Sequence, residues 1–528
     1  MTESSSFNSL PLAGYAHNRH AVLVIFVIGI VTVLLVRHIR SPYRKLPPGP
    51  TGLPVFGNLL TLANRPDIAK FTEWKKTYGD LIHFSALGQR IIVITSNQAA
   101  VDLLEHRSGK YSDRPQSIVA NTLTGGHIMV LKSCDAAWRR HRRAANDALK
   151  KDIVHQYRLT ETTEAIVLAS DLLACPEDWK AHFRRRAASL IISIVYDHPP
   201  IDKEDTDKTS FKKISEITDR LILGSKPGEY LVDLLPWMVH IPRRFAKWRR
   251  FAEEHFKNDS EYLESLVDGV KERMTLGTIR SCFTTVLVEN MTSYKLTSEE
   301  NAWLAGTMYI GGTETSATML PWFLKAMLLY PNVQQRAQDE LDAVVGRSRA
   351  PTFADFDQLP YIQAMVHELL RWRSPTLFGF PRSTSEDDWY NGMFIPKGTI
   401  CLPHAWLLNR DPELFGPDAA DFNPARYLDE TGRLKTDMPE HLSFGFGKRV
   451  CVGKHVANDI LFIDIALVLW SSNIERVRDP NGEPVPMDKD GYVEHGIVVN
   501  PLPFDCKISP RFPEVSSILD DEKELRGI

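Results

Sequence analysis

A glycine-rich loop around one cysteine carries the residues best suited to redox chemistry. The segment 441–453 reads HLSFGFGKRVCVG, with Cys451 near its end. A cysteine thiolate that ligates iron pushes electron density onto the metal and favours cleavage of an O–O bond. Such a ligand needs a tight loop whose backbone N–H groups point at the sulfur. Glycine permits these close turns, and the loop contains Gly445, Gly447 and Gly453.

Two further side chains of the loop suit an iron porphyrin. Phe444 can shield the sulfur from water, and the Arg449 guanidinium can reach a haem propionate as a charge-assisted pair. The alternative is a glycine-rich turn around a buried cysteine, which is the better interpretation of Cys451 taken alone. The spacing of Phe444, Gly447, Arg449, Cys451 and Gly453 favours the metal ligand.

The bulk composition excludes other classes of protein. The other five cysteines are scattered and form no C-x-x-C pair, so neither a disulfide framework nor a clustered cysteine zinc site is expected. The chain has 528 residues and a formal net charge of -3, which does not suit a nucleic-acid-binding protein. Its 43% of apolar and 24% of charged residues are typical of a packed globular protein.

The spacing F-x-x-G-x-R-x-C-x-G resembles the signature of the cytochrome P450 superfamily, and the remaining motifs follow in the order found there. The resemblance extends over essentially the whole chain and is closest to fungal, membrane-anchored enzymes of secondary metabolism. It implies haem b, iron protoporphyrin IX, with Cys451 as the axial thiolate ligand of the iron. It also implies the mainly α-helical cytochrome P450 fold with small β-sheets.

Helices are the elements expected to position these motifs. Apolar periodicity predicts amphipathic helices over 332–345 and 361–372. No linker divides the chain after residue 50, so one haem-thiolate monooxygenase domain is expected over 51–510, followed by a charged, frayed tail over 511–528. Short β-type runs occur at 81–84, 90–95 and 390–400.

The front of the chain is typical of a membrane anchor. Residues 21–36, AVLVIFVIGIVTVLLV, carry no charge and would span roughly 24 Å as a helix. A basic cluster at 37–45 follows in place of a small-residue cleavage site, which favours an anchor over a signal peptide. The cluster predicts a single-pass protein of the endoplasmic reticulum membrane, with residues 1–20 in the lumen and a cytosolic catalytic body. The basic, proline-rich stretch 37–50 is expected to be a stiff linker.

The segment 302–319, AWLAGTMYIGGTETSATM, resembles the family's long central helix across the distal face of the haem. Glycine inside a helix costs about 1 kcal/mol relative to alanine, so the pair Gly311 and Gly312 is interpreted as room for O2 and substrate. The resemblance makes Thr315 the hydrogen-bonding group for bound oxygen or its water, and Glu314 the acid that helps to relay protons. The alternative is a serine- and threonine-rich surface helix.

Glu368 and Arg371 form an E-x-x-R pair on one face of the helix over 361–372. Such spacing is most often a solvent-exposed ion pair. The resemblance instead implies a buried network with Arg426 of the sequence FNPARY, in which removal of one partner costs about 3–5 kcal/mol.

Trp138 and Arg142 lie four residues apart and resemble the family's propionate-binding helix. Arg142 would pair with one propionate, with help from Arg449. Arg382 occupies a position where relatives use histidine or arginine for the same purpose.

A basic surface is expected on the cysteine side of the haem. It would consist of Arg139, Arg140, Arg143, Lys448 and Lys454. A solvated charged face is one interpretation; the other is a docking surface for an acidic redox partner. The resemblance implies NADPH–cytochrome P450 reductase as that partner, with cytochrome b5 as a further candidate.

The resemblance places substrate contacts at 117–127, 211–239, Met308, 375–380 and 492–497. The side chains of Leu377, Phe378 and Phe380 make one of these segments apolar, which suits a lipophilic small molecule such as a terpenoid or polyketide. The sequence therefore predicts a reductase-dependent monooxygenase. A haem-thiolate isomerase or peroxygenase and a non-catalytic haem protein are the alternatives, and the Glu314–Thr315 pair argues against both.

Overall fold

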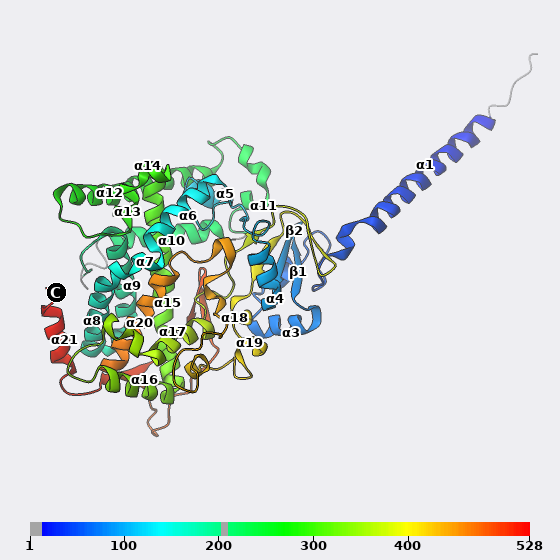
Figure 1. Ribbon diagram of the computed structural model, residues 1–528. Coiled ribbons are helices and arrows are strands. Elements are labelled where there is room, and N and C mark those ends of the chain that lie inside the picture. The colour runs from blue at the N-terminus through cyan, green and yellow to red at the C-terminus, as the bar shows by residue number, and fades with distance from the viewer. Residues whose placement is uncertain (1–12, 202–209, 227) are drawn as a thin grey trace, which may run out of the picture.

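Helix α15, Ser298–Leu329, lies inside the body and carries much of its packing (Figure 1). In its capping box the Thr297 hydroxyl accepts a hydrogen bond from the Glu300 N–H, and the Glu300 carboxylate accepts one from the Thr297 N–H. Residues on every face of α15 are buried, because α9 (Trp179–Tyr196) and α12 (Lys247–Leu276) pack against it. The segment 302–319 is thus part of a core helix and not of a surface helix.

The computed structural model describes residues 13–201, 210–226 and 228–528. Residues 1–12 of the expected lumenal segment lie outside the described residues. Residue 227, within the expected substrate segment 211–239, also lies outside them.

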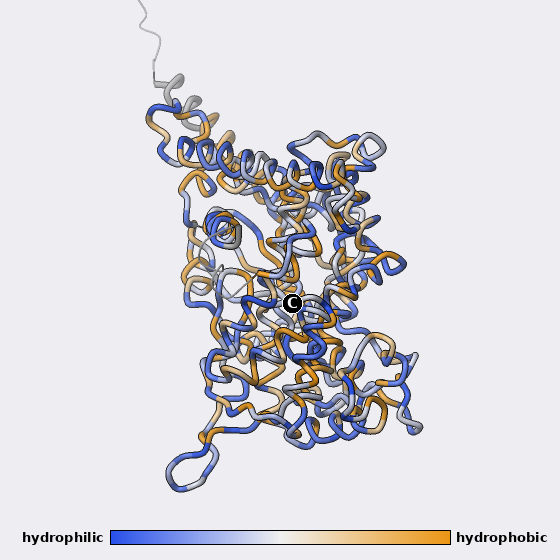
Figure 2. The backbone as a smooth tube through the Cα atoms, turned by 90° about the vertical axis from the view of Figure 1, so that its left-hand side faces the viewer, coloured by the Kyte–Doolittle hydropathy of each residue, from blue (hydrophilic) through white to orange (hydrophobic). Residues whose placement is uncertain are grey.

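Both predicted amphipathic helices are confirmed. They are α16 (Pro331–Val344) and α17 (Pro360–Trp372), and each begins with a proline in its first turn, where the missing N–H costs nothing. Hydrophobic and hydrophilic residues alternate along most helices of the body, as expected of elements with one buried face (Figure 2). Further helices are α2 (Leu59–Ala63), α3 (Ile68–Tyr78), α4 (Asn97–Val101), α5 (Ile118–Leu123), α6 (Ala136–Leu149), α7 (Lys151–Val154), α8 (Arg158–Ala174), α10 (Ser210–Ser225), α11 (Leu231–Leu234), α13 (Phe283–Glu289), α14 (Met291–Tyr294), α18 (Ala405–Leu408), α19 (Pro412–Phe415) and α20 (Lys454–Ser471).

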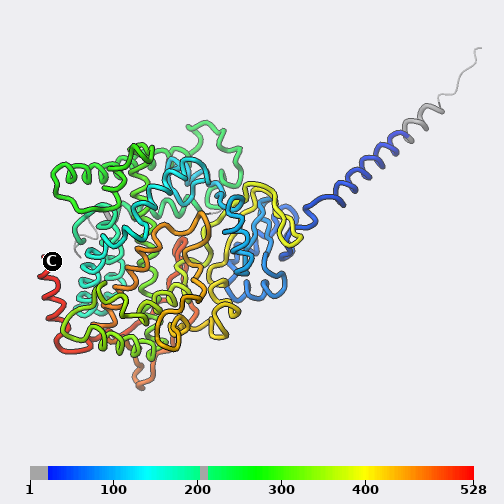
Figure 3. Tube along the Cα trace, viewed as in Figure 1, coloured from blue at the N-terminus to red at the C-terminus, as the bar shows by residue number. Residues whose placement is uncertain are grey.

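The tail is not frayed throughout, contrary to expectation. Residues Val515–Glu524 form helix α21, which packs against α8 (Figure 3). Val515 and Leu519, four residues apart, are both fully buried. These apolar positions, and not the charges between them, decide the conformation.

The largest sheet has the strand order β1-β2-β6-β3. Strands β1 (Leu81–Ala86) and β2 (Gln89–Ile94) pair antiparallel and confirm two of the predicted β-type runs. The third run, 390–400, is broken by Asn391 and Gly392, which both have positive φ and form a tight hairpin turn. The other strands are β3 (Arg382–Ser383), β4 (Asp388–Tyr390), β5 (Met393–Ile395), β6 (Ile400–Pro403), β7 (Ser472–Arg476), β8 (Tyr492–His495), β9 (Val498–Pro501) and β10 (Cys506–Pro510).

Helix α1, Ala13–Arg40, projects away from the body (Figure 1). Among the described residues, one span is long and apolar enough to cross a membrane. It is Val22–Lys45, which begins inside α1, ends a few residues beyond it, and has an apolar window with no buried residue. The helix continues past the predicted end at Val36 into the basic residues. Cations near a helix C-terminus are favoured by the helix dipole, so the basic stretch extends the helix and does not end it.

Candidate functional site

The cysteine loop, residues 441–453, contains two short 3-10 helices, Leu442–Phe444 and Gly447–Arg449, and leads directly into α20. Gly447 has a φ of +51°, and a Cβ atom there would lie 2.5 Å from the Leu104 carbonyl oxygen, so only glycine fits. The Cys451 N–H donates to the Phe444 carbonyl at 2.8 Å and closes the turn. The Gly453 N–H donates to the Cys451 sulfur, an arrangement that stabilises a thiolate.

The surroundings of Cys451 fit an iron ligand. Burial raises the pKa of this thiol, while the Gly453 N–H and the positive charges of Arg142 and Lys454 lower it. The sulfur also precedes the N-terminus of α20, whose dipole favours an anion. Cys451 is exposed, so a ligand can reach its sulfur. A bound metal ion is what deprotonates a thiol in such a place outright.

The middle of α15 presents an accessible stripe formed by Met308, Gly311 and Thr315. Gly311 is exposed, and a Cβ atom there would meet nothing within 4 Å, which agrees with its interpretation as open room. Gly312 differs, because a Cβ atom would lie 3.0 Å from the Ile191 side chain of α9. Gly312 therefore permits close helix packing and does not provide the expected open room. The Thr315 hydroxyl donates to the Gly311 carbonyl at 2.8 Å.

Glu314 faces a different direction from Thr315. It lines a small pocket with Thr218 of α10, on a neighbouring face of α15. Burial raises the pKa of the Glu314 carboxyl, and the nearby charges of His495 and Arg184 lower it. No hydrogen bond joins the side chains of Glu314 and Thr315 in the described part of the chain.

A group of buried and partly buried arginines lies around the cysteine loop. Arg449 lies over the Trp138 ring of α6, with its guanidinium 4.3 Å from the ring centroid. Its Nε donates to the Ser112 carbonyl at 2.8 Å. Arg382 and Arg114 also donate to backbone carbonyls. Their acceptors are Leu104 O and Phe446 O for Arg382, and Phe380 O and Pro381 O for Arg114.

The charges of this group suit two carboxylates. Burial, and next the like charges of Arg449 and Arg382, hold the pKa of Arg114 well below its usual range. Burial likewise lowers the pKa of Arg142, and lowers those of Arg382 and Arg449 to about 10. None of these four guanidinium groups forms an ion pair with a carboxylate of the described residues. Buried and partly buried cations without a carboxylate counter-ion are costly, and the two propionates of a haem would compensate them. Arg114 was not predicted, because it belongs to no motif of the sequence.

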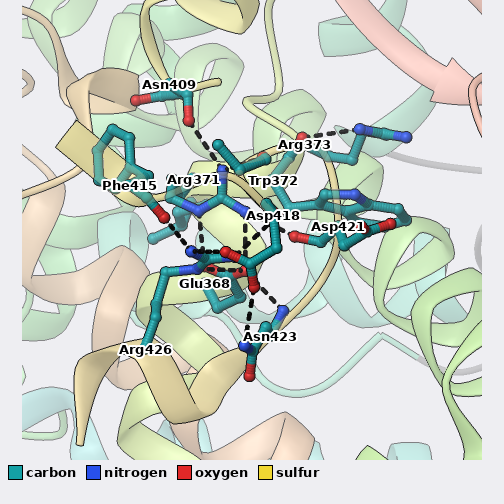
Figure 4. A network of polar contacts seen from close by, with 12 residues as sticks. Glu368, Arg371, Trp372, Arg373, Asn409, Phe415, Asp418, Asp421, Asn423 and Arg426 are labelled. Atoms are coloured by element: carbon teal, nitrogen blue, oxygen red, sulfur yellow. Dashed lines mark hydrogen bonds and ion pairs between the residues drawn. The ribbon is translucent and has the colours of Figure 1, made fainter. Parts of the chain in front are cut away.

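Glu368, Arg371 and Arg426 lie together in one buried network (Figure 4). Arg371 donates to both oxygens of Glu368, at 2.6 and 2.7 Å, and Arg426 Nε lies 3.1 Å from Glu368 Oε1. Glu368 also accepts from the Asn423 N–H at 2.7 Å. Arg371 also donates to three backbone carbonyls. Its Nη1 donates to those of Asn409 and Ala419, and its Nη2 donates to that of Asp421.

Asn409 connects this network to the cysteine loop. Its carbonyl accepts from Arg371 at 2.8 Å, while its side-chain oxygen accepts from the Leu442 N–H at 2.8 Å. Its amide donates to the Ser443 hydroxyl at 3.0 Å, and that hydroxyl donates to the Leu370 carbonyl of α17 at 2.6 Å. The network thereby fixes the start of the loop that ends at Cys451.

The expected basic surface is only partly free. Arg139, Arg143 and Lys448 are exposed, and Lys454 is partly buried. Arg140 is not free, contrary to expectation, because its Nη2 pairs with Glu300 Oε1 at 3.1 Å.

The apolar residues after the network are largely occupied with packing. Leu377 is buried, and the Phe378 ring lies 4.5 Å from that of His404. Phe380 packs under the Arg114 guanidinium. Other expected substrate segments lie side by side: Asp233 Oδ1 accepts from the Ile118 N–H at 2.6 Å, and Gly496 touches Ile222 of α10.

A thiolate loop, a long helix with an open stripe and a cluster of unpaired cations define a haem-thiolate protein. The family model of cytochrome P450 matches residues 47–508. A cytochrome P450 monooxygenase of Armillaria gallica is 48% identical over 96% of this chain and 98% of its own length. Cytochrome P450 monooxygenase 58 of Postia placenta is 41% identical over 94% of this chain and 95% of its own. Cytochrome P450 monooxygenase iboC of Amanita muscaria is 37% identical over 91% of this chain and 94% of its own.

The chain belongs to the cytochrome P450 family, and like these fungal relatives it is a monooxygenase, an oxidoreductase. The family implies a haem cofactor with thiolate ligation, a redox partner and a small-molecule substrate.

Proposed function

We propose that this protein is a membrane-anchored monooxygenase of the endoplasmic reticulum that oxidises a lipophilic small molecule of fungal secondary metabolism. NADPH–cytochrome P450 reductase would supply the electrons, with cytochrome b5 as a further donor. The observation that carries the proposal is the Cys451 loop, in which the Gly453 N–H points at the sulfur of an exposed cysteine. Helix α1 and its basic end support the membrane anchor and the cytosolic position of the body.

Haem b bound at Cys451 would supply the iron at which O2 is activated. The residues of the chain would do the rest. Arg114, Arg142, Arg382 and Arg449 would hold the propionates as charge-assisted pairs. The Thr315 hydroxyl, which now donates to Gly311, can turn its hydrogen toward a water on the accessible side of α15. Glu314 would deliver protons through water from the neighbouring face of α15, where burial raises its pKa and favours the protonated form.

The lipophilic substrate is supported by the character of the accessible stripe on α15. Met308 and Gly311 offer no charge, and the thioether of methionine adapts to irregular apolar ligands. The exposed cations Arg139, Arg143 and Lys448 support the docking of an acidic redox partner.

Reconstitution with purified components tests the proposal. The full-length protein in lipid nanodiscs is combined with a fungal NADPH–cytochrome P450 reductase and a panel of terpenes and polyketides. We expect NADPH-dependent products heavier by one oxygen atom, with the added atom derived from 18O2. Product formation from hydrogen peroxide alone, with none from NADPH and reductase, would favour a peroxygenase instead. Rates that do not fall as salt is raised would contradict the charged docking surface.

A further inference from the structure

Three side chains from separate segments converge near the amino end of α15. They are His127, from the loop after α5, His141 of α6 and Glu300 of α15. One ligating atom of each lies within 4.8 Å of the others, and His141 Nε2 is 3.9 Å from Glu300 Oε1. Two imidazole nitrogens and one carboxylate oxygen are the protein donor set of tetrahedral zinc sites that keep a fourth position for water. Ligand atoms in such a site lie about 3.3 Å apart, so small side-chain movements would complete it.

His141 is the strongest sign of a missing ligand. Its side chain is fully buried, and neither ring nitrogen has a hydrogen-bond partner among the described residues. An unpartnered buried polar group is costly, and coordination would satisfy it. Burial also lowers the pKa of His141 to about 4, so near neutral pH its imidazole is uncharged and has a lone pair to donate.

The other two side chains are already oriented. His127 Nε2 lies 2.8 Å from Glu299 Oε1, while its Nδ1 has no described partner. A metal-bound histidine usually donates a hydrogen bond from its second ring nitrogen to a carboxylate, as His127 Nε2 could to Glu299. Glu300 is held by its capping bond, in which Oε2 accepts from the Thr297 N–H at 3.0 Å, while Oε1 accepts from Arg140 and lies 3.9 Å from His141 Nε2.

Two cationic side chains near the cluster would compete with a metal ion for the carboxylates. Arg140 Nη2 lies 3.1 Å from Glu300 Oε1, but its side chain is 36% exposed and can turn to solvent. Lys132 donates to the Gly126 carbonyl at 2.7 Å and is a second nearby cation. Glu299 and Glu300 offset these two charges. A divalent ion that binds Glu300 Oε1 would take the place of Arg140 at this oxygen.

We propose that His127, His141 and Glu300 bind a divalent transition-metal ion of the zinc class, which fastens the segment 126–132 to α6 and α15. This segment matters for the cofactor, because the carbonyls of Met129 and Lys132 accept hydrogen bonds from Arg449, at 3.4 and 2.7 Å. The ion would stiffen the support of Arg449 and slow the loss of haem. The effect on haem rests on the proposed propionate role of Arg449, whereas binding of the ion does not.

Zinc binding is measured on the full-length, haem-loaded protein in detergent after chelation and dialysis. We expect one zinc ion per chain by mass spectrometry. The His127→Gln and Glu300→Gln variants should bind it at least 100-fold more weakly. Glu300→Gln is a mild change, since glutamine also serves the capping box. The matched control is Glu299→Gln, which removes only an outer contact and should weaken binding about tenfold. X-ray absorption at the zinc edge should show nitrogen and oxygen neighbours at about 2.0 Å and no sulfur.

Equal zinc binding by wild type and both ligand variants, or none by wild type, would overturn the site. Haem transfer to apomyoglobin provides the second measurement, and zinc should slow it at least threefold in wild type and not in His127→Gln. Zinc binding with unchanged haem transfer would refute the bracing of Arg449 and retain the site. Neither readout depends on turnover, so a failure of the proposed reductase-dependent reaction is seen separately.

Discussion

Replacement of Arg371 by alanine should abolish haem retention, and the structure gives the magnitude. The guanidinium donates five hydrogen bonds, two to Glu368 and three to backbone carbonyls. Breaking a buried ion pair by removing one partner costs about 3–5 kcal/mol. Leaving carbonyls unpaired adds about 1–3 kcal/mol each where water does not replace the donor. Arg426 and the Asn423 N–H still hold Glu368, which limits the loss.

We therefore expect a total loss of about 4–6 kcal/mol for Arg371→Ala, because these contributions overlap. Such a loss is a large part of the stability of a typical domain, which is about 5–15 kcal/mol. The Asn409 connection makes the cysteine loop the part that loosens first. Haem content per chain, from the pyridine haemochrome spectrum, and the urea midpoint are measured together.

Two control variants separate geometry from charge. Arg371→Lys keeps the positive charge and loses the planar fork, so it should recover little haem. Arg347→Ala removes the cation of a solvent-exposed pair with Asp342 and should leave haem content unchanged. Wild-type haem content and midpoint in Arg371→Ala would refute the assignment of the network as the support of the loop.

Three further changes test neighbouring features. Gly447→Ala should yield protein with little haem, because its Cβ atom would collide with the Leu104 carbonyl at 2.5 Å; haem content decides. Gly312→Val should lower the urea-derived unfolding free energy by about 1–3 kcal/mol through overpacking on Ile191, and wild-type stability would contradict this. Burial lowers the pKa of His404 to about 3 from 6.5, so the unfolded chain binds a proton that the folded chain does not. Stability should therefore fall by about 2–3 kcal/mol as the pH falls from about 6.5 to 4.5, and less in His404→Phe; equal slopes would contradict this.

The parts of the site that could be predicted are those set by short-range spacing. The Cys451 loop depends on residues within ten positions of one another, and Glu368 and Arg371 share one helical turn. The apolar run of α1 is equally local. In each case the residue types and their spacing restrict the local backbone without information from the rest of the chain.

Other features depend on contacts between distant segments and left no mark in the sequence. Arg114 is held in place by the carbonyls of residues 380–381, which lie far from it in the sequence. Asn409 connects the buried network to the loop through its own backbone and side chain, without any motif. Glu314 and Thr315 are neighbours in the sequence, but consecutive residues of a helix point in different directions, so the two side chains lie on different faces of α15.

The C-terminal tail also shows that composition alone does not predict local structure. Its charges predict a frayed end, and this is wrong for Val515–Glu524 because two buried positions on one face outweigh many exposed ones. Composition describes the exposed face of such a helix, whereas its partner α8 decides whether it forms.

Carbon monoxide binding to the reduced protein tests sulfur ligation most directly. Full-length wild type and Cys451→Ser are purified from the same host, reduced with dithionite and exposed to the gas. Wild type should show the red-shifted Soret band that an anionic sulfur donor produces, and the serine variant should lose that band together with its turnover. A wild-type spectrum without the shift, or the same shifted band in both proteins, would contradict the account.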